Sequence, residues 1–309
     1  MPEGSAPAAA TRVAPERVVQ RLDWQVVRRL DGLLQGEYGS LFRGSGMDLA
    51  NLREYQPGDD IRALDWNVTA RTDVPYVREF HEERELTAWF LLDLSPSVDF
   101  GTAADGRLKR TVLVDFVTTL ARVLTRRGNR VGAIVYGAGV QRTIPVASGR
   151  LAVLRLVDEL LRQPMLESAP PTDLRELLDT GLKVIRRRSL VVIVSDFISE
   201  PGWEGRLHLL NQRHELLAVR LTDPRERILP DVGVVVVGDA ETGEQLEIDT
   251  SDRRFRERFE RAAAEREAAV TRSLAAAGVQ VATLSTEDDL VRAIVRMAGE
   301  RRRRSRGRR

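Results

Sequence analysis

Three oxygen-bearing side chains alternate along residues 93–97, directly after an apolar run. They are Asp93, Ser95 and Ser97 in the stretch FLLDLSPSVDFG. Because alternate residues of an extended chain point to the same side, these three side chains can face one point. Carboxylates and hydroxyls are hard oxygen ligands, which suit Mg²⁺, Mn²⁺ or Ca²⁺ better than zinc. The spacing therefore indicates a candidate site for a divalent cation.

Two further oxygen-bearing residues stand where they can join this group. Asp196 ends the apolar stretch SLVVIVSD, and Thr172 opens the helical stretch TDLRELL. Ligands of a parallel sheet collect outside the carboxyl ends of the central strands, so these positions bring the residues to one edge. Taken singly, Thr172 is also suited to cap a helix and Asp196 to end a strand. Taken together, the order predicts one divalent-cation site made of Asp93, Ser95, Ser97, Thr172 and Asp196.

The ion that best suits this set is Mg²⁺, with Mn²⁺ or Ca²⁺ as alternatives. A neutral hydroxyl binds a cation weakly, so the two carboxylates must supply negative charge, either directly or through water. Mg²⁺ takes about six ligands in an octahedral array. Three hydroxyls, together with waters held by the two carboxylates, leave at least one position open. An oxygen from outside the chain can fill it.

A regular alternation of strands and helices from Thr87 onward supplies the frame for this site. The stretch at 189–196 is apolar throughout, as expected for a strand that is covered on both faces. The alternation predicts an α/β fold with a mainly parallel, doubly wound sheet flanked by helices. We expect strands at 87–93, 130–136, 140–146, 189–196, 216–221, 233–239, 244–249 and 279–285. We expect helices at 107–127, 150–162, 173–187, 251–278 and 288–299.

Composition divides the chain into four parts. Residues 1–15 are rich in Ala and Pro, and we expect them to be disordered. Residues 16–86 contain an amphipathic helix at 16–36, followed by an Arg- and Asp-rich segment of loops and short strands. Residues 87–300 form the α/β domain. Residues 301–309, RRRRSRGRR, form a disordered basic tail.

The overall composition is that of a globular protein. The chain has 309 residues, of which 42% are hydrophobic and 30% charged. It has no uninterrupted apolar run of roughly 18 residues and no apolar signal core at its start. It contains no Cys, which excludes disulfides and thiolate metal sites and fits the cytoplasm. Because seven Arg of the tail contribute to the net charge of +2, residues 1–300 carry 2 − 7 = −5. The body of the protein is therefore mildly acidic.

The five predicted ligands resemble the metal-ion-dependent adhesion site of von Willebrand factor A domains. The matching residues are Asp93, Ser95 and Ser97 in DLSPS, Thr172 in PTDLRELL and Asp196 in VVIVSDF. The resemblance covers roughly residues 85–290. It implies that the hydroxyls coordinate the ion directly, that the Asp residues act mostly through water, and that a carboxylate of a protein partner completes the shell. Asp99 lies outside the motif, and we interpret it as a solvated loop acid.

A second resemblance precedes the first strand of the α/β domain. The stretch LREYQPGDDIRALDWNVTARTDVPYVREFHEERE is similar to the signature of bacterial domain-of-unknown-function-58 proteins, which carry an A-type domain. Its charges alternate closely enough to form an ion-pair network, and we expect Trp66 to pack against the sheet. Two interpretations stay open, a structural brace on the α/β domain and a docking surface for a partner. On the second interpretation, the binding residues are Arg53, Asp59, Asp60, Arg62 and Arg71.

The leading functional interpretation is a non-enzymatic protein-binding module that depends on a divalent cation. The family resemblance implies an adaptor or co-chaperone of a MoxR-type AAA+ ATPase. The sequence lacks the G-x-x-x-x-G-K-[ST] loop, the G-x-S-x-G elbow and the H-E-x-x-H pattern. A metal-dependent hydrolase is an alternative, although it needs a general base near the ion. A polyanion or nucleic-acid binder that acts weakly through the Arg-rich tail is another.

Overall fold

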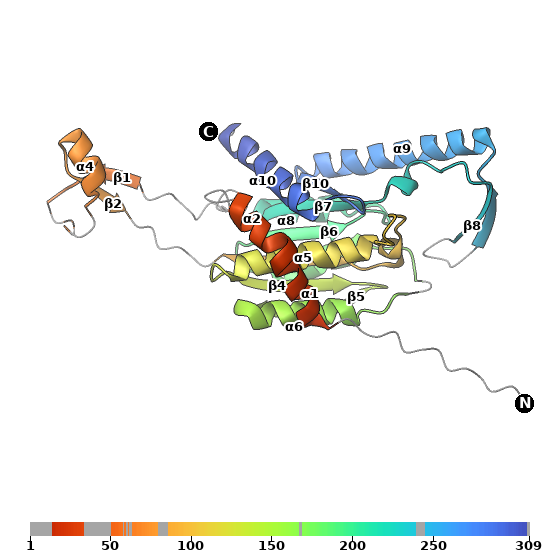
Figure 1. Ribbon diagram of the computed structural model, residues 1–309, viewed down its shortest axis with the longest axis horizontal. Helices are drawn as coiled ribbons and strands as arrows, with labels where there is room; N and C mark the ends of the chain where they lie inside the picture. The colour runs from red at the N-terminus through yellow and green to blue at the C-terminus, as the bar shows by residue number, and fades with distance from the viewer. Residues whose placement is uncertain are drawn as a thin grey trace, which may run out of the picture.

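The computed structural model describes residues 14–33, 51–57, 59, 61, 64–79, 86–166, 169–238 and 245–307. Its centre is a six-stranded sheet in the order β10–β7–β6–β3–β4–β5 (Figure 1). Every neighbouring pair is parallel except the hairpin of β4 and β5. The strands are β3 (Thr87–Asp93), β4 (Arg130–Tyr136), β5 (Val140–Ala147), β6 (Leu190–Ser195), β7 (Glu215–Thr222) and β10 (Gln280–Ser285).

The chain enters this sheet at its centre and builds it outward in both directions. β3 comes first, and β4 and β5 extend the sheet on one side. The chain then returns to place β6 against the other side of β3 and continues through β7 to β10. The strand order therefore reverses between β3 and β6, which is where open sheets form ligand sites. The expected mainly parallel, doubly wound sheet is confirmed.

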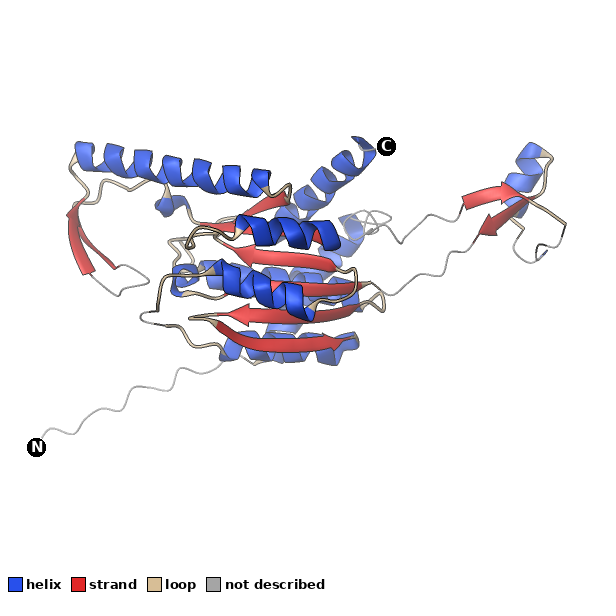
Figure 2. Cartoon of the chain, turned by 180° about the vertical axis from the view of Figure 1, so that it is seen from behind, coloured by secondary structure: helices blue, strands red, loops and turns tan. Residues whose placement is uncertain are grey.

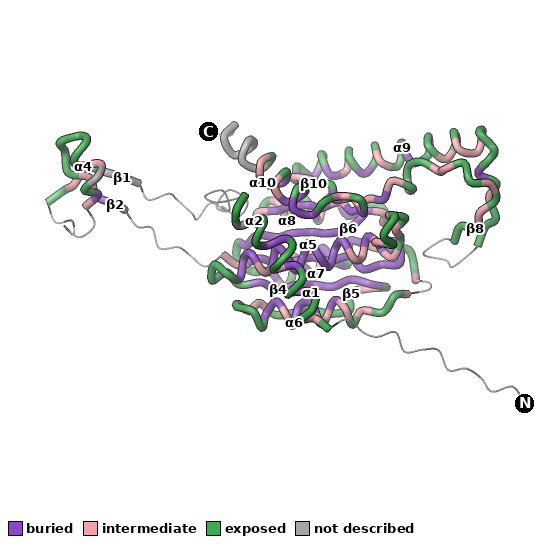
Figure 3. The backbone as a smooth tube through the Cα atoms, viewed as in Figure 1, coloured by how far each residue is buried: buried purple, intermediate pink, exposed green. Residues whose placement is uncertain are grey.

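Alternate residues of the central strands face two different hydrophobic cores. Phe90 and Leu92 of β3 join the core under α1 (Pro15–Leu22), α5 (Lys109–Thr125) and α6 (Gly149–Arg162). Trp89 and Leu91 join the opposite core, under α7 (Leu174–Val184), α8 (Glu204–Arg213) and α9 (Arg253–Ala276). Figures 1 and 2 show the two helical layers from opposite sides, and Figure 3 shows the buried strands between them. Because both faces are covered, these strands are apolar throughout, without the alternation of a half-exposed strand.

One continuous helical segment at the N-terminus packs across α5 and α6. It consists of α1, a π-helical stretch (Asp23–Val27) and α2 (Arg28–Leu33). Its buried residues repeat at helical spacing, and ion pairs join Arg21 to Asp115 at 2.5 Å and Asp23 to Arg122 at 2.9 Å. The expected N-terminal helix is therefore present. We predicted disorder over residues 1–15. Residues 1–13 lie outside the described residues, and Pro15 already begins α1.

A small unit precedes the sheet. It contains β1 (Asn51–Glu54), α4 (Trp66–Thr72) and β2 (Tyr76–Glu79), and β1 pairs antiparallel with β2. Figure 1 shows this unit apart from the central sheet. Trp66 is 67% exposed on α4, so the expectation that it packs against the sheet is wrong. The segment builds its own short hairpin, and the indole lies on the outer side of its helix.

The C-terminal third adds a hairpin and two helices. β8 (Val234–Gly238) pairs antiparallel with β9 (Gln245–Asp249), and α9 follows. The last helix, α10 (Leu290–Gly307), continues past the end expected at 299 into the segment expected to be a disordered tail. Arg has a high helix propensity, which favours this continuation. Within the described ranges, we find no helix with the length and apolar character needed to cross a bilayer.

Candidate functional site

The predicted site residues lie at the point where the strand order reverses. Asp93 ends β3, and Asp196 directly follows the last residue of β6, the neighbouring parallel strand. Ser95 and Ser97 lie in the loop after β3, where residues 96–99 form a short 3₁₀ helix, η3 (Pro96–Asp99). Thr172 precedes α7. The side chains of all five residues are buried.

The carboxylate of Asp93 links the ends of the two central strands, β3 and β6, through hydrogen bonds. Its Oδ1 accepts a hydrogen bond from the backbone N–H of Ser95 at 3.0 Å. Its Oδ2 accepts one from the hydroxyl of Ser195, at the end of β6, at 2.6 Å. Burial, followed by the nearby charge of Asp196, raises the pKa of Asp93 from 3.8 to about 6, although its hydrogen bonds oppose the shift. A positive charge placed here would therefore favour the ionised form of Asp93.

The hydroxyl oxygens of Ser95 and Ser97 lie 3.1 Å apart. Two adjacent ligands of an octahedral ion are separated by about 3 Å when each metal–oxygen distance is about 2.1 Å, the usual distance for Mg²⁺. The two hydroxyls are thus spaced as neighbouring ligands of a small hard cation. Their common loop gives them this spacing, because η3 turns the chain between them.

The loop after β6 holds Asp196 in a constrained turn. Its Oδ1 accepts a hydrogen bond from the backbone N–H of Ile198 at 3.0 Å. The next residue, Phe197, has a φ of 61°, which costs a non-glycine residue of order 1 kcal/mol or more. The buried ring of Phe197 packs against Trp203, with the ring centroids 5.6 Å apart, and this contact stabilises the turn.

The helix cap next to the site is Asp173, and not Thr172 as the sequence suggested. The side chain of Asp173 accepts a hydrogen bond from the backbone N–H of Arg175 at the start of α7. The carbonyl of Thr172 accepts hydrogen bonds from the N–H of Glu200 at 2.8 Å and from the Ser199 hydroxyl at 2.9 Å. These bonds tie the Thr172 loop to the loop that follows β6, so Thr172 belongs to the same edge of the sheet as Asp196.

A lysine that the sequence analysis did not select completes the site. The ammonium of Lys109, the first residue of α5, lies 2.8 Å from Oδ2 of Asp196 and 2.5 Å from Oε1 of Glu226. The Lys109 side chain is 1% exposed. Burial opposes its charge, but the carboxylates of Asp196 and Glu226 outweigh this effect and raise the pKa of Lys109 above its usual value. Lys109 is therefore a permanent cation at the site.

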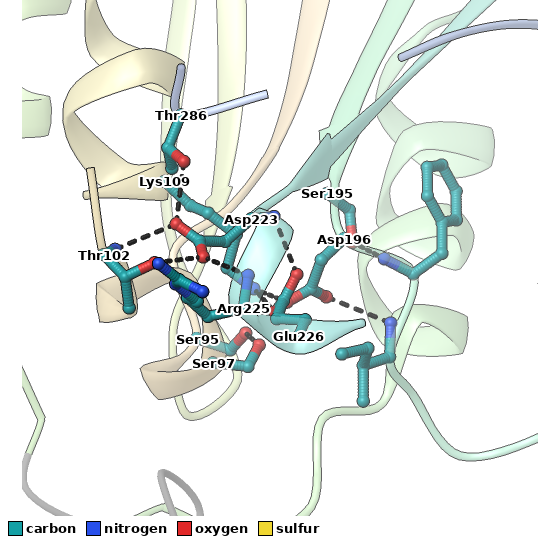
Figure 4. A network of polar contacts seen from close by, with 12 residues as sticks. Ser95, Ser97, Thr102, Lys109, Ser195, Asp196, Asp223, Arg225, Glu226 and Thr286 are labelled. Carbon is teal, nitrogen blue, oxygen red and sulfur yellow. Dashed lines mark hydrogen bonds and ion pairs between the residues drawn. The ribbon is translucent and has the colours of Figure 1, made fainter. Parts of the chain in front are cut away.

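Lys109 connects the site to a second polar cluster at the ends of β7 and β10 (Figure 4). Glu226 lies in η4 (Pro224–Glu226), a short 3₁₀ helix whose capping residue is Asp223. The N–H of Asp223 donates a hydrogen bond to the carboxylate of Glu226. The carboxylate of Asp223 accepts one hydrogen bond from the hydroxyl of Thr102 and one from the hydroxyl of Thr286. The network thus joins the loop after β3, the start of α5 and the ends of β6, β7 and β10.

The chain near the start of α5 is tightly packed. The backbone N–H of Lys109 donates to the carbonyl of Phe100 at 2.9 Å. A side chain at Gly101 would collide with the backbone of Arg107 and Leu108. This close approach of two backbone segments fixes the position from which the Lys109 side chain enters the site.

Asp99 also differs from the sequence interpretation. Its side chain is only 11% exposed and forms an ion pair with Arg110. The guanidinium of Arg110 also donates to the carbonyl of Gln163 at 3.1 Å. Asp99 is therefore a largely buried partner of α5 and not a solvated loop acid. It braces the loop that carries the two serine hydroxyls.

The donor set suits a hard divalent cation, with one complication. Two hydroxyls at ligand spacing stand beside the buried carboxylates of Asp93 and Asp196, and oxygen donors of this kind suit Mg²⁺. Across the described part of the chain, no group of three or more His, Cys, Asp or Glu side chains is placed to hold a metal. An ion here would depend on hydroxyls and water, and it would meet Lys109 already paired with Asp196.

Three of the five residues predicted to bind a partner, Arg53, Asp59 and Arg71, lie in the β1–α4–β2 unit and not at the strand ends. Arg53 stands opposite Val77 in the β1–β2 pair. The carboxylate of Asp59 accepts a hydrogen bond from the N–H of Gln56 at 2.8 Å. Arg71 is exposed in the last turn of α4. The other two predicted residues lie outside the described residues, namely Asp60 and Arg62.

Comparison with known proteins identifies relatives along most of the chain. The family model named "Protein of unknown function DUF58" matches residues 51–269. Uncharacterized proteins of Mycobacterium bovis and Mycobacterium tuberculosis are each 37% identical over 285 residues, which is 92% of this chain and 89% of theirs. The conserved hypothetical protein BatB of Bacteroides thetaiotaomicron is similar in structure, with 11% identity, a TM-score of 0.43 and coverage of 70% of this chain and 98% of that one. The manganese-loaded TRAP protein of Plasmodium vivax has 18% identity, a TM-score of 0.34 and coverage of 44% of this chain and 57% of that one.

Proposed function

This chain belongs to the family of proteins of unknown function DUF58 and has a von Willebrand factor A-like fold. We propose that it is a non-enzymatic protein-binding module and that its binding to a protein partner depends on a divalent cation. Mg²⁺ is the ion proposed, and Mn²⁺ or Ca²⁺ can replace it where the ligand spacing allows. The ligands are Ser95, Ser97 and Thr172 directly, with Asp93 and Asp196 acting through water.

The observation that carries this proposal is the pair of serine hydroxyls beside two buried carboxylates. Ser95 and Ser97 present oxygens 3.1 Å apart at the reversal point of the sheet. Neutral hydroxyls leave most of the charge of a bound ion uncompensated. A carboxylate from a protein partner supplies the missing negative charge and occupies the open coordination position. Binding of the partner and of the ion then support each other.

The partner proposed is a MoxR-type AAA+ ATPase, with this chain as its adaptor or co-chaperone. The β1–α4–β2 unit adds charged groups that can orient such a partner, and Arg71 is exposed on α4. We place this contact in the cytoplasm, which fits a chain without Cys.

A metal-dependent hydrolase is the second candidate, and one observation favours it. The pKa of Asp93 is raised to about 6, which is a suitable value for a general base. Both oxygens of this carboxylate, however, already accept hydrogen bonds from Ser95 and Ser195. Of the three His, His81 lies outside the described residues, His208 lies in α8, and His214 is buried at the end of that helix. Binding without turnover is therefore the better-supported function.

The test is a binding titration with the MoxR-type ATPase of the same organism, in Mg²⁺ and in EDTA. Ser95→Ala is expected to weaken binding about tenfold or more, and EDTA is expected to weaken it by a similar factor. The two effects should not add, because both remove one contact. Ser273→Ala is the control, since that hydroxyl bonds to Glu204 on the α8–α9 side of the molecule. An unchanged dissociation constant in EDTA contradicts the proposal, and metal-dependent hydrolysis of a phosphoester or peptide that Ser95→Ala abolishes favours the hydrolase.

A further inference from the structure

Lys109 is unusual both in its type and in its position. Only two of the 48 basic residues of the chain are Lys, and the other, Lys183, is exposed on α7. Lysine at the first position of a helix is commonly solvated, yet the side chain of Lys109 is 1% exposed. Its ammonium enters the candidate cation site, where the ring of Phe100 lies 5.9 Å away. A compact ammonium can fit between two carboxylates where the planar fork of an Arg needs more room.

The two carboxylates beside this ammonium differ in what else they do. Asp196 lies at the candidate cation site, and Glu226 lies outside it, in η4 after β7. Glu226 has its other oxygen bonded to the N–H of Asp223 at 2.9 Å, so its position does not depend on Lys109 alone. The structure therefore offers Lys109 two anionic partners, of which only Asp196 is needed by an incoming ion.

We propose that Lys109 is the resident counter-cation of the site, and that a divalent ion must displace it from Asp196, after which Glu226 holds the ammonium. This inference rests on the cation site of the proposed function. A divalent ion and an ammonium a few ångströms apart repel each other inside a buried site, so the two compete for the same carboxylate. The competition lowers the affinity for the ion.

The competition also couples the ion to a distant part of the sheet. Glu226 and Asp223 form the capping box of η4, and Asp223 joins the loop after β3 to the loop after β10 through Thr102 and Thr286. When the ammonium shifts toward Glu226, the charge balance of this cluster changes. Occupation of the cation site is thereby linked to the ends of β7 and β10 (Figure 4).

The experiment measures Mn²⁺ affinity by calorimetry and by electron paramagnetic resonance, with the full-length chain throughout. Lys109→Met removes the competing charge, so we expect it to raise the affinity for Mn²⁺ about tenfold or more. Glu226→Gln keeps an acceptor for the Asp223 N–H but leaves the ammonium with Asp196 alone, so we expect it to lower the affinity several-fold. Lys183→Met is the matched control and should bind Mn²⁺ as the wild type does.

Lys109→Met leaves two carboxylates without their cation, and thermal unfolding in EDTA and in Mn²⁺ shows whether it folds. The double variant Lys109→Met/Glu226→Gln removes one positive and one negative charge together and should also bind Mn²⁺ more tightly than the wild type. If neither Lys109→Met nor the double variant folds, the Mn²⁺ affinity of Glu226→Gln decides. Mn²⁺ binding by Glu226→Gln that equals or exceeds that of the wild type overturns the inference.

The outcomes separate this inference from the proposed function. If the wild type binds Mn²⁺ and Lys109→Met binds it no more tightly, the competition is overturned while the cation site stands. If only the variants without Lys109 bind Mn²⁺, the competition is supported and the cation dependence of the wild type fails. If no variant binds Mn²⁺, both are overturned.

Discussion

The ammonium of Lys109 lies 2.8 Å from Oδ2 of Asp196, at the edge where β3 and β6 end side by side. One residue begins a helix and the other follows a strand, and 87 positions separate them in the chain. The fold brings them together because the loop after β3 leads directly into α5, on the same edge as the end of β6. A cation from the protein and the ligands for a cation from solution thus share one buried site.

Removal of either serine hydroxyl should weaken metal binding without harming the fold. We expect Ser95→Ala and Ser97→Ala each to lower Mg²⁺ affinity about tenfold, because each removes a direct ligand. The melting temperature in EDTA should fall by no more than about 5 °C, since the hydrogen bond lost is worth about 1 kcal/mol. Calorimetry and thermal unfolding measure the two quantities. A serine variant that keeps wild-type Mg²⁺ affinity would remove that hydroxyl from the site.

The raised pKa of Asp93 predicts a particular dependence of stability on pH in EDTA. Below about pH 3.8 this carboxyl is protonated in both the folded and the unfolded chain and has no effect. Between about pH 3.8 and 6 the unfolded chain loses this proton first, so the folded state becomes less stable as the pH rises. A shift of this size corresponds to about 3 kcal/mol, which remains lost above pH 6.

Asp93→Asn should remove that contribution. We compare the unfolding free energies of wild type and Asp93→Asn by urea unfolding in EDTA. As the pH rises from about 3.8 to 6, the wild type should lose stability relative to the variant. In Mg²⁺ the wild type should regain stability, because the ion binds only its folded state, and Asp93→Asn should gain less. A difference that stays constant from pH 4 to pH 7 would contradict the pKa shift of Asp93.

Asp223 should be important for stability although it is not a proposed ligand. It is fully buried, and burial raises its pKa, but hydrogen bonds from Thr102 and Thr286 outweigh this effect and hold its pKa below the usual value. Its contribution is therefore present above about pH 4 and is lost as the pH falls through its folded pKa. Asp223→Ala should lower the free energy of unfolding by about 3 kcal/mol at pH 7, because it leaves several donors without their acceptor, among them the buried hydroxyl of Thr286.

The matched control for Asp223 is Asp249→Ala. Asp249 also accepts hydrogen bonds from its neighbour Ser251, but it is exposed in the β8–β9 hairpin. Its removal should change the unfolding free energy by less than about 0.5 kcal/mol. Equal losses for the two variants in urea unfolding would show that the Asp223 cluster does not hold the strand ends together.

Deletion of residues 301–309 should leave the fold and the metal affinity unchanged. Among the residues of α10 whose side chains are described, which reach to position 300, the last buried one is Ala298, and the deletion begins beyond them. Any weak binding of a polyanion should be lost with the tail and should decline steeply with salt. Thermal unfolding and a titration with single-stranded nucleic acid measure both effects. A melting temperature lowered by more than about 5 °C would show that the tail stabilises the domain.

The strands and the ligand loops could be predicted from the sequence because their patterns are local. The apolar run that ends at Asp93 and the one that precedes Asp196 mark two buried strands, and their ends give the place of the ligands. The expected strand at 87–93 has the same bounds as β3. The sequence therefore predicts where Asp93, Ser95 and Asp196 lie, whereas their role as ligands stays a prediction.

Lys109 and Glu226 could not be predicted in the same way. Nothing in the helical periodicity of α5 shows that its first residue turns into the sheet edge, and Glu226 lies 117 positions further along the chain, in a turn of three residues. The scarcity of Lys was visible in the sequence, and it was the one property that could have drawn attention to Lys109. The exposed position of Trp66 could not be predicted either, because β1 and β2 pair with each other in a separate unit and leave this side chain off the central sheet.

The most direct measurement is a calorimetric titration of Mg²⁺ into the wild type and into Asp93→Ala, in the same buffer and at the same pH. The strand-end site predicts saturable binding of one ion by the wild type. It predicts an affinity at least about tenfold lower for Asp93→Ala, because that carboxylate both supplies charge and joins the loop of Ser95 to the end of β6. Equal Mg²⁺ affinity of the two proteins, or no binding by either, would contradict a cation site at these residues.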